Sequence, residues 1–335
     1  TCAFTLAFLL IFLPYTVFHE AISWMIQGVL WISRQSYGML TIGHVPFLWV
    51  LLFYFMTGLW IWKKNGQNRH IRISLAYVIM IILIWIPMAR RKSLAFLDVG
   101  QGDCFVADTK SGAIIFDGGS SSEDQVGRYR ILPYMKYLGY QKIQIAVISH
   151  MDIDHYSGIK ELLEMGKIKY LGLPEIPKDE TMKKIIGIAK KRGTTIFYLS
   201  RGRQITTKDG SLKVLHPQKN SQMEKNAASL VMQGKILGYR VLLTGDVEKE
   251  GEEELLSEEL ERADILKAAH HGSKNSTSNE FLQKVQPKQT VISCGKQNRY
   301  GHPHLETIHR LQTYRTKIYR TDRSGAIIFF KRRDG

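Results

Sequence analysis

The chain has 335 residues, with 46 Lys and Arg against 30 Asp and Glu, and a formal net charge of +16. Three cysteines spread along it exclude a disulfide framework and a cysteine-based zinc site, so any metal must be bound by His and Asp. The length predicts two domains, and the charge pattern divides the chain likewise, because residues 1–92 contain a single acidic residue, Glu20.

Three apolar segments occupy residues 1–92, each about long enough to cross the hydrocarbon core of a bilayer: Cys2–Phe18, Val45–Trp62 and Ile73–Met88. Buried helices of a soluble domain are the alternative, but one acidic residue leaves no polar face for water. We therefore predict transmembrane helices over 1–92, with an amphipathic, Trp-bearing interfacial helix at Glu20–Ser33. Because the chain starts with Thr inside an apolar stretch, we expect it to be the tail of a longer polypeptide.

Positive charge indicates an orientation for these segments. The loop Lys63–Arg72 holds four basic residues, whereas the connection Phe18–His44 holds only Arg34. The first loop should then be cytoplasmic and the soluble domain should lie on the outer face of the cell membrane. The basic run Arg90–Lys92 argues for the opposite orientation, although such residues also bind the headgroups of membrane lipid. We expect a multi-pass protein of the cell membrane.

Residues 93–335 read as alternating strands and helices. Short apolar runs separated by Gly and Asp predict an opening β-meander: Leu94–Val99, Cys104–Ala107 and Ala113–Phe116. A helix at Tyr129–Leu138, a buried strand at Ile143–Ile148 and a helix starting at Ile159 follow. Later strands are predicted over 229–233, 240–243, 264–268 and 290–293, with a charged helix at Glu248–Glu261. The order predicts a layered α/β domain with its helices outside.

The segment from His150 to His155 places two histidines and two carboxylates directly after the buried strand. Imidazole and carboxylate groups at a strand's end are typical ligands of a divalent metal. A polar loop facing water is the alternative. Three more segments near strand ends carry similar groups, which makes coincidence a poor explanation: Thr244-Gly245-Asp246, His270-His271-Gly272-Ser273 and Tyr300-Gly301-His302-Pro303-His304.

The order His-x-Asp-x-Asp-His, Thr-Gly-Asp and His-His-Gly-Ser resembles the metallo-β-lactamase superfamily, in which an αββα sandwich holds one or two metals at the sheet edges. With the segment Phe96–Asp103, the Tyr-Gly-His-Pro motif and the apolar segments ahead, the chain resembles more narrowly the C-terminal part of the ComEC-type competence proteins of bacterial DNA uptake. The resemblance implies an α/β fold, a metallo-β-lactamase-like αββα sandwich preceded by transmembrane helices. It also implies DNA and other proteins of the competence machinery as partners.

The resemblance assigns two groups of metal ligands. One metal would be held by His150 and Asp152, and the second by Asp154 and His155. Asp246 would bridge the two metals, and His271 or its neighbour His270 would complete the second site.

Two positions depart from the superfamily's pattern. Asp152 stands where the loop usually has a second His, and Asn226 stands where a further His is expected. Both changes replace nitrogen by oxygen. We therefore expect one or two divalent ions, manganese or zinc with magnesium as an alternative, or a weakly filled first position.

The expected chemistry is attack on phosphorus by a water that the metal activates. Asp154 and His271 would act at the catalytic centre. The leaving alkoxide would take a proton from His302, with His304 or the non-ligand member of His270 and His271 as alternatives. Asp103, Asp117 and Asn226 are expected to form hydrogen bonds to the ligands. A capping box at Thr277–Glu280 predicts a helix whose N-terminus could receive a phosphate.

Residues 93–335 carry 38 basic and 29 acidic residues, an excess of +9. Clusters at 183–184, 190–192, 201–203 and 331–333 favour an anionic polymer as partner. We expect a membrane-tethered, metal-dependent phosphodiesterase or nuclease that hydrolyses DNA during uptake. The alternatives are a catalytically weak, DNA-guiding part of the channel and a phosphodiesterase acting on an ester that is not nucleic acid.

Overall fold

The computed structural model describes residues 20, 23–24, 26–28, 43–45, 47–62, 91–223, 226–258 and 260–332. The chain divides into two compact units, Thr1–Ile42 and Gly43–Gly335. Helix α3 (Phe47–Trp62), in the second unit, has 16 residues and corresponds to one predicted apolar segment. Across the described ranges, no helix combines the length and apolar character that a membrane span requires. The predicted segments Cys2–Phe18 and Ile73–Met88 lie outside the described residues.

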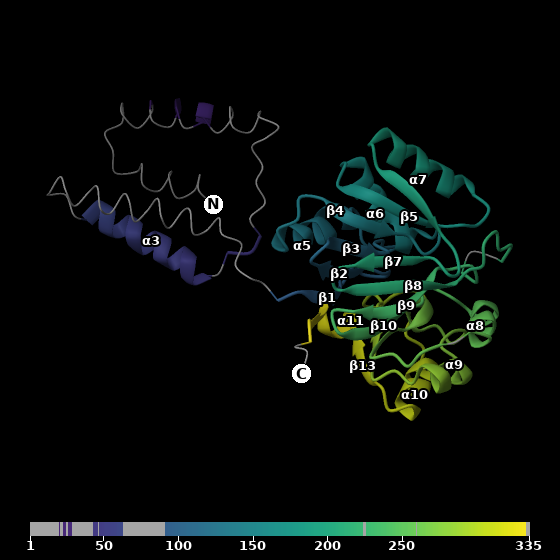
Figure 1. Ribbon diagram of the computed structural model, residues 1–335. Coiled ribbons are helices and arrows are strands. Elements are labelled where there is room, and N and C mark those ends of the chain that lie inside the picture. The colour runs from purple at the N-terminus through teal and green to yellow at the C-terminus, as the bar shows by residue number, and fades with distance from the viewer. Residues whose placement is uncertain are drawn as a thin grey trace. The chain divides into compact units, whose positions relative to one another are not determined.

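Residues 91–332 are built around two seven-stranded sheets (Figure 1). The first sheet has the spatial order β14 (Ile327–Phe330), β1 (Ser93–Phe96), β2 (Phe105–Thr109), β3 (Gly112–Phe116), β4 (Ile143–Val147), β5 (Ile168–Pro174) and β6 (Thr195–Leu199). The second has the order β13 (Lys317–Arg320), β12 (Gln289–Ile292), β11 (Ile265–Lys267), β10 (Tyr239–Leu243), β9 (Val231–Ile236), β8 (Gly210–His216) and β7 (Gln204–Thr207).

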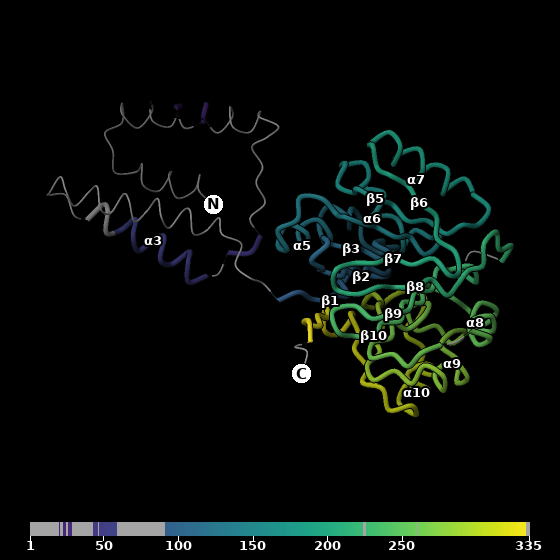
Figure 2. Tube along the Cα trace, viewed as in Figure 1, coloured from purple at the N-terminus to yellow at the C-terminus, as the bar shows by residue number. Residues whose placement is uncertain are grey.

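Helices cover the outer face of each sheet, as the traces in Figures 1 and 2 show. The first sheet is covered by the π-helix η1 (Gly127–Ile131), α5 (Leu132–Tyr137), α6 (Ile153–Glu164) and α7 (Glu180–Lys191). The second is covered by α8 (Lys249–Leu256), α9 (Asn279–Val285) and α10 (Leu305–Thr313). Residues 91–332 also contain two short elements, the 3₁₀-helix η2 (Ala269–Gly272) and α11 (Thr321–Ser324).

Three apolar layers hold these elements together. Strand β2 shows the pattern, because Phe105 packs between the two sheets whereas Val106 packs under the helices of the first sheet. On the other side, Phe281 of α9 and Leu311 of α10 pack on the outer face of the second sheet. The four layers are therefore helix, sheet, sheet and helix, and the predicted αββα sandwich is confirmed.

The predicted meander is confirmed, since β1, β2 and β3 pair antiparallel in sequence order. Two helix boundaries were wrong. Helix α6 begins at Ile153 rather than Ile159, because Asp152 adopts the extended conformation of an N-cap directly after the strand. Helix α8 ends at Leu256, short of the predicted Glu261. The earlier start of α6 places Asp154 and His155 in its first turn.

Parallel pairing positions the polar residues. Strand β3 pairs parallel with β4, and β10, β11 and β12 are parallel neighbours. The carboxyl ends of parallel strands meet at the same edge of a sheet, where α/β proteins place their ligands. The metal-ligand residues that follow β4, β10 and β11 in the sequence therefore lie together.

Candidate metal centre

Four side chains from the two sheets converge through their outer atoms. The Nε2 atom of His155 lies 3.1 Å from Oδ2 of Asp246. The Nε2 atom of His271 lies 3.3 Å from the same oxygen and 3.3 Å from Oδ2 of Asp154. Ligand atoms about 2.0–2.2 Å from a divalent metal lie about 2.8–3.6 Å from their neighbours in octahedral or tetrahedral geometry. The spacing of Asp154, His155, Asp246 and His271 fits one divalent metal.

The rings of the two histidines are held from behind. Nδ1 of His155 lies 3.0 Å from Oδ2 of Asp117, and Nδ1 of His271 lies 2.9 Å from the carbonyl oxygen of Ser293. Each Nδ1–H can donate to the oxygen it faces, which leaves Nε2 available to a metal. Within the part of the chain that the structure describes, neither Nε2 atom is hydrogen-bonded, although both side chains are at most 1 % exposed. Unbonded ring nitrogens at this depth are what a metal ligand requires.

The protonation states of the two carboxylates and two histidines depend on one another. Burial opposes ionisation of Asp154, but the neighbouring His271, 3.3 Å away, and the charge of His155 lower the pKa of its carboxyl to about 2. Burial likewise opposes the charge of His271, but Asp246 and Asp103 raise its pKa to about 10. The pKa of His155 is raised and that of Asp246 is lowered by their mutual attraction, against burial. Without a metal, protons on the two histidines thus balance the carboxylates.

A buried lysine lies inside this cluster. The ammonium of Lys267, on β11, forms a close ion pair with Oδ2 of Asp103 and lies 3.4 Å from Oδ1 of Asp246. It also donates to the carbonyl oxygen of Gly245, at 3.0 Å. Burial alone would lower the pKa of Lys267, but the charges of Asp103 and Asp246 raise it. Lys267 is therefore a fixed positive charge that holds one oxygen of Asp246.

Asp103 lies behind the histidines rather than in front of them. One atom each of Asp103, His155, Asp246 and His271 lies within 4.8 Å of the others, which makes them a possible metal group. However, the Asp103 oxygens face the Nδ1 atoms of His155 and His271, at 3.8 Å each. Those Nδ1 atoms face Asp117 and Ser293, and Lys267 already neutralises Asp103. The Nε2 side, with Asp154, is the better metal position.

Gly102, the second glycine of the segment Gly100-Gln101-Gly102-Asp103, allows Asp103 to lie beside the candidate metal centre. A side chain at Gly102 would collide with the carbonyl oxygens of Gly119 and Asp154. The close approach allows the backbone N–H of Asp103 to donate to the carbonyl of Asp154, at 3.0 Å. The loop before β2 is thus attached to the first turn of α6.

The two neighbouring histidines on η2 have different surroundings. Both have left-handed backbone conformations, with φ of 46° at His270 and 52° at His271, so they point in different directions. His270 is partly exposed, and its Nδ1 lies 2.8 Å from Oε1 of Glu248. Its Nε2 lies 3.8 Å from Oδ2 of Asp246, farther than that of His271. Of the pair, His271 has the geometry of a ligand.

The other predicted metal position has fewer protein ligands. His150 is buried, and its Nε2 lies 3.7 Å from Oδ2 of Asp152. The Asp152 side chain is 36 % exposed at the rim. Asn226, which stands where a further histidine is expected, accepts through its carbonyl oxygen from the backbone N–H of Ser229, at 3.0 Å. The Ser229 hydroxyl in turn accepts from the backbone N–H of Asp246, at 3.3 Å. His150 and Asp152 thus form an incomplete set of ligands.

An open cavity of about 230 Å³ lies over the centre. Its lining includes Asp154, Asp246, His270 and His271, together with Asp152, Gln101, Tyr300 and His302. Burial and the nearby charges of His271 and His270 lower the pKa of His302 to about 4. The cavity brings His302 to the rim, with its ring centroid 6.1 Å from that of His271. All predicted catalytic residues therefore border one cavity.

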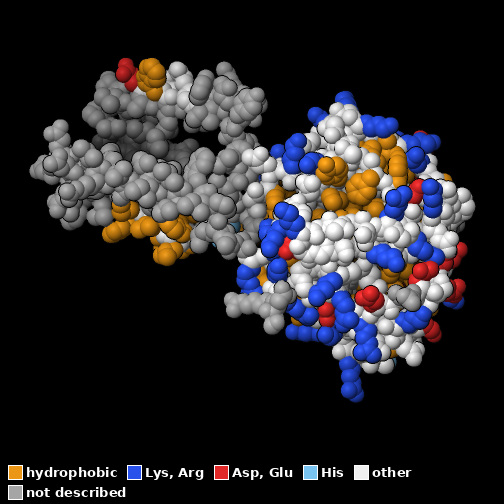
Figure 3. Space-filling model, in the orientation of Figure 1, with side chains coloured by type: hydrophobic (Ala, Val, Ile, Leu, Met, Phe, Trp, Pro, Cys, Tyr) orange, Lys and Arg blue, Asp and Glu red, His pale blue; other side chains and the backbone are white. Residues whose placement is uncertain are grey.

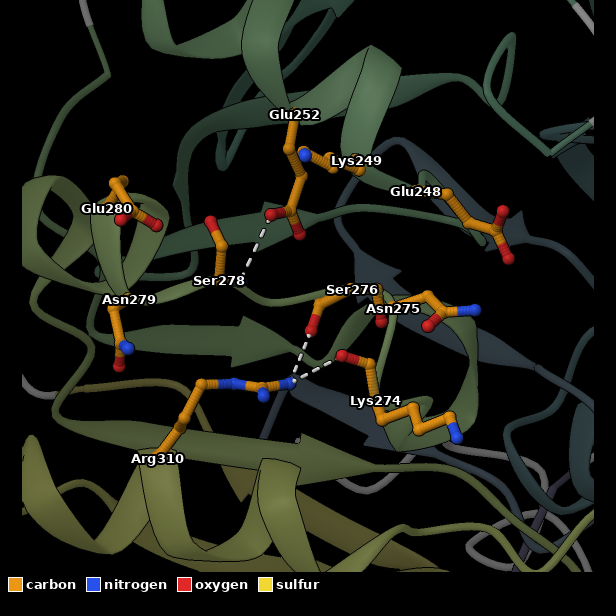
Figure 4. A pocket seen from close by; sticks show the side chains of 10 residues that line it. All are labelled: Glu248, Lys249, Glu252, Lys274, Asn275, Ser276, Ser278, Asn279, Glu280 and Arg310. Atoms are coloured by element: carbon orange, nitrogen blue, oxygen red, sulfur yellow. Dashed lines mark hydrogen bonds between the residues drawn. The ribbon is translucent and has the colours of Figure 1, made fainter.

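A second cavity of about 530 Å³ lies beyond Glu248, between α8, α9 and α10 (Figure 4). The predicted phosphate site at the start of α9 belongs to this region. Instead, the carboxylate of Glu252 accepts hydrogen bonds from the backbone N–H groups of Thr277 and Ser278. The helix is capped one residue later than predicted, by Ser278, which accepts from Phe281 N–H. Glu252 thus occupies the place expected for a phosphate.

Sequence reasoning did not single out Lys267 and treated Asp103 only as a hydrogen-bonding neighbour. The available signal for Lys267 was its position. It is the single charged residue in the apolar run Ile265–Ala268, shortly before two histidines. A buried cation requires a buried anion, so a lysine in such a strand indicates a carboxylate partner.

Comparison with known proteins agrees with these observations. The family described as "Metallo-beta-lactamase superfamily" matches residues 97–296. ComE operon protein 3 of Bacillus subtilis is 34% identical over 82% of this chain and 38% of its own length. Competence protein ComA of Neisseria gonorrhoeae is 30% identical over 71% of this chain and 32% of its own length. The chain spans about a third of the length of these relatives.

Among solved structures, the metallo-β-lactamase fold protein YhfI from Bacillus subtilis is 13% identical, with a TM-score of 0.48. The match covers 70% of this chain and 99% of that protein.

Proposed function

We propose, since the chain belongs to the metallo-β-lactamase superfamily and its relatives make it a ComEC-type competence protein, that it hydrolyses the phosphodiester bonds of DNA during DNA uptake. The observation that carries this proposal is the convergence of Asp154, His155, Asp246 and His271. Oδ2 of Asp246 lies 3.1 Å from Nε2 of His155 and 3.3 Å from Nε2 of His271, which itself lies 3.3 Å from Asp154. An open cavity is lined by three of them, Asp154, Asp246 and His271. Two carboxylates and two imidazoles suit manganese or zinc.

A divalent metal held by these four residues would supply an activated water and neutralise the charge of the phosphate. The chain's own groups would prepare that site. Asp117 and the Ser293 carbonyl orient His155 and His271, and Lys267 fixes one oxygen of Asp246 while the other faces the metal position. We further propose that a second ion binds more weakly at His150 and Asp152, sharing Asp246.

The leaving alkoxide needs a proton, and His270 is better placed to give it than His302. Glu248 faces Nδ1 of His270 at 2.8 Å, which orients the ring with its Nε2 3.8 Å from Oδ2 of Asp246. Burial and the neighbouring histidines lower the pKa of His302 to about 4, so that it is a neutral imidazole at neutral pH. We therefore assign proton donation to His270 and a neutral, substrate-facing role to His302.

His270→Gln is expected to lower DNA cleavage about 10²-fold or more, because an alkoxide is a poor leaving group without its proton. The same variant should affect a p-nitrophenyl phosphodiester much less, since nitrophenolate leaves unprotonated. Steady-state rates on both substrates are the measurement, and His302→Gln is the matched control. An equal loss on both substrates would show that His270 does not donate the proton.

Membrane attachment and the DNA partner are part of the proposal. The apolar segments within residues 1–92 support a tether to the cell membrane, with the catalytic domain on the outer face. Lys and Arg side chains are spread over the face of the catalytic domain in Figure 3, as contact with a polyanion requires. Some are engaged elsewhere: Arg201 pairs with Glu254 and Glu258 at 2.8 Å each. The attraction of DNA would therefore come from basic residues distributed over the surface rather than from one cluster.

The test uses the full chain, purified in detergent, stripped of metal and reloaded with manganese, magnesium or zinc. DNA labelled at one end is expected to be cut after manganese is added, and a chelator should stop the reaction. Intact DNA with hydrolysis of a simple phosphodiester would point to an ester that is not nucleic acid.

Two observations favour a second candidate, a DNA-guiding part of the channel with little turnover. The incomplete position at His150 and Asp152 and the buried charge of Lys267 both reduce the number of metals the centre can hold. Under this candidate, DNA binds but stays intact with every metal in the same assay.

A further inference from the structure

The loop between β12 and α10 presents a stack of flat side chains at the rim of the metal cavity. The Tyr300 ring lies over the His302 ring, with centroids 5.7 Å apart and planes inclined by 20°. The guanidinium of Arg299 lies 4.9 Å from the centroid of the Tyr300 ring and donates to its hydroxyl at 2.7 Å. Tyr300 is 42 % exposed and lines the cavity together with His302.

The loop is held in this conformation before any substrate arrives. The Asn298 side chain accepts hydrogen bonds from the backbone N–H groups of Tyr300, at 3.2 Å, and His302, at 2.9 Å. Its amide nitrogen donates to the carbonyl oxygens of Gly295 and His302, at 2.9 and 2.6 Å. An aromatic ring fixed in this way loses little conformational freedom when a ligand stacks on it.

An unpartnered donor lies in the same cavity. The side-chain oxygen of Gln101 accepts from the backbone N–H of Gly295 at 3.0 Å, which fixes the orientation of the amide. The amide nitrogen of Gln101 has no hydrogen-bond partner among the described residues, and the residue is 2 % exposed. A buried amide donor without a partner indicates an acceptor that is supplied by a ligand.

We propose that Tyr300 is the stacking surface for a nucleobase next to the cleaved phosphodiester, that Arg299 supports this ring and contacts the neighbouring phosphate, and that Gln101 donates to an oxygen of the nucleotide. This proposal rests on the proposed function. Stacking on a side chain requires a base face that is not covered by a neighbouring base. The site therefore selects single-stranded nucleic acid or a frayed end, and the bases contribute to recognition as well as the charged backbone.

The test compares two oligomers with the same phosphate backbone, oligo-dT and a fully abasic analogue, using the manganese-loaded full chain. The wild-type chain is expected to cleave oligo-dT with a kcat/KM at least about tenfold above that of the abasic oligomer. Tyr300→Leu should reduce the ratio to near one by slowing cleavage of oligo-dT alone. Tyr300→Phe, which keeps the ring but loses the hydroxyl, is the matched control and should keep the preference.

The outcomes separate the two proposals. Cleavage of both oligomers at equal rates by the wild-type chain, or an equal loss on both in Tyr300→Leu, overturns base stacking and leaves the phosphodiesterase proposal intact. Failure to cleave either oligomer contradicts the proposed function. In that case, binding of an oligomer containing 2-aminopurine still tests stacking, because Tyr300→Leu should abolish the quenching of its fluorescence and Tyr300→Phe should not.

Discussion

Asp246→Asn is expected to lower DNA hydrolysis at least about 10³-fold, because Asp246 contacts both histidines of the centre and its charge is needed for a divalent metal. Metal content should fall in parallel, since an amide oxygen binds Mn²⁺ or Zn²⁺ more weakly than a carboxylate does. The measurements are single-turnover cleavage of labelled DNA and metal content by mass spectrometry. The lost charge also leaves Lys267 with only one carboxylate partner.

Asp264→Asn is the matched control for loss of a buried carboxylate. Asp264 comes directly before β11 on the same sheet, and it pairs with Lys288 at 3.0 Å rather than with the centre. This variant should keep both metal content and rate. Retention of metal and of activity within about tenfold in Asp246→Asn would contradict the assignment of Asp246 as a ligand.

Lys267→Met is expected to lower the free energy of unfolding of the metal-free chain by about 3–5 kcal/mol, because it leaves Asp103 as an unpaired buried carboxylate. Urea denaturation at neutral pH, followed by circular dichroism, measures the change. Methionine has nearly the length of lysine, so lost packing contributes little. Removal of the Lys267 charge should also allow the candidate metal centre to bind a divalent metal at a lower concentration of free metal.

Two further variants test whether the unpaired carboxylate of Asp103 causes the loss of stability. Asp103→Asn combined with Lys267→Met removes both charges and should recover much of the lost stability. Lys183→Met breaks an exposed pair with Glu180 and should leave stability essentially unchanged. A Lys267→Met protein as stable as the parent would mean that Asp103 finds another partner or a proton without penalty.

Sequence patterns predicted the layers of the fold because each layer leaves a local trace. Alternating residues such as Phe105 and Val106 indicate a strand with two buried faces, and a polar residue directly after such a strand lies at the sheet edge. The pattern predicted that Asp154, His155, Asp246 and His271 would lie near one another. It could not distinguish His271 from His270, because that choice depends on two left-handed backbone conformations and on the carbonyl of Ser293.

Lys267 and Asp103 show the limit of such reasoning. Their ion pair joins β11 of one sheet to the loop before β2 of the other, and no short-range pattern links residues so far apart in the chain. The phosphate site expected at the start of α9 failed for a similar reason. The side chain that caps those N–H groups, Glu252, comes from a different helix.

The candidate ligands come from both halves of the sandwich. Asp154 and His155 belong to the helix after β4 in the first sheet, whereas Asp246 and His271 follow β10 and β11 in the second. A metal bound to all four would act as a cross-link between the two sheets, comparable to a disulfide in closing a long loop of chain. Metal binding would then oppose separation of the halves, so that the chain would resist unfolding and proteolysis best when it is loaded for catalysis.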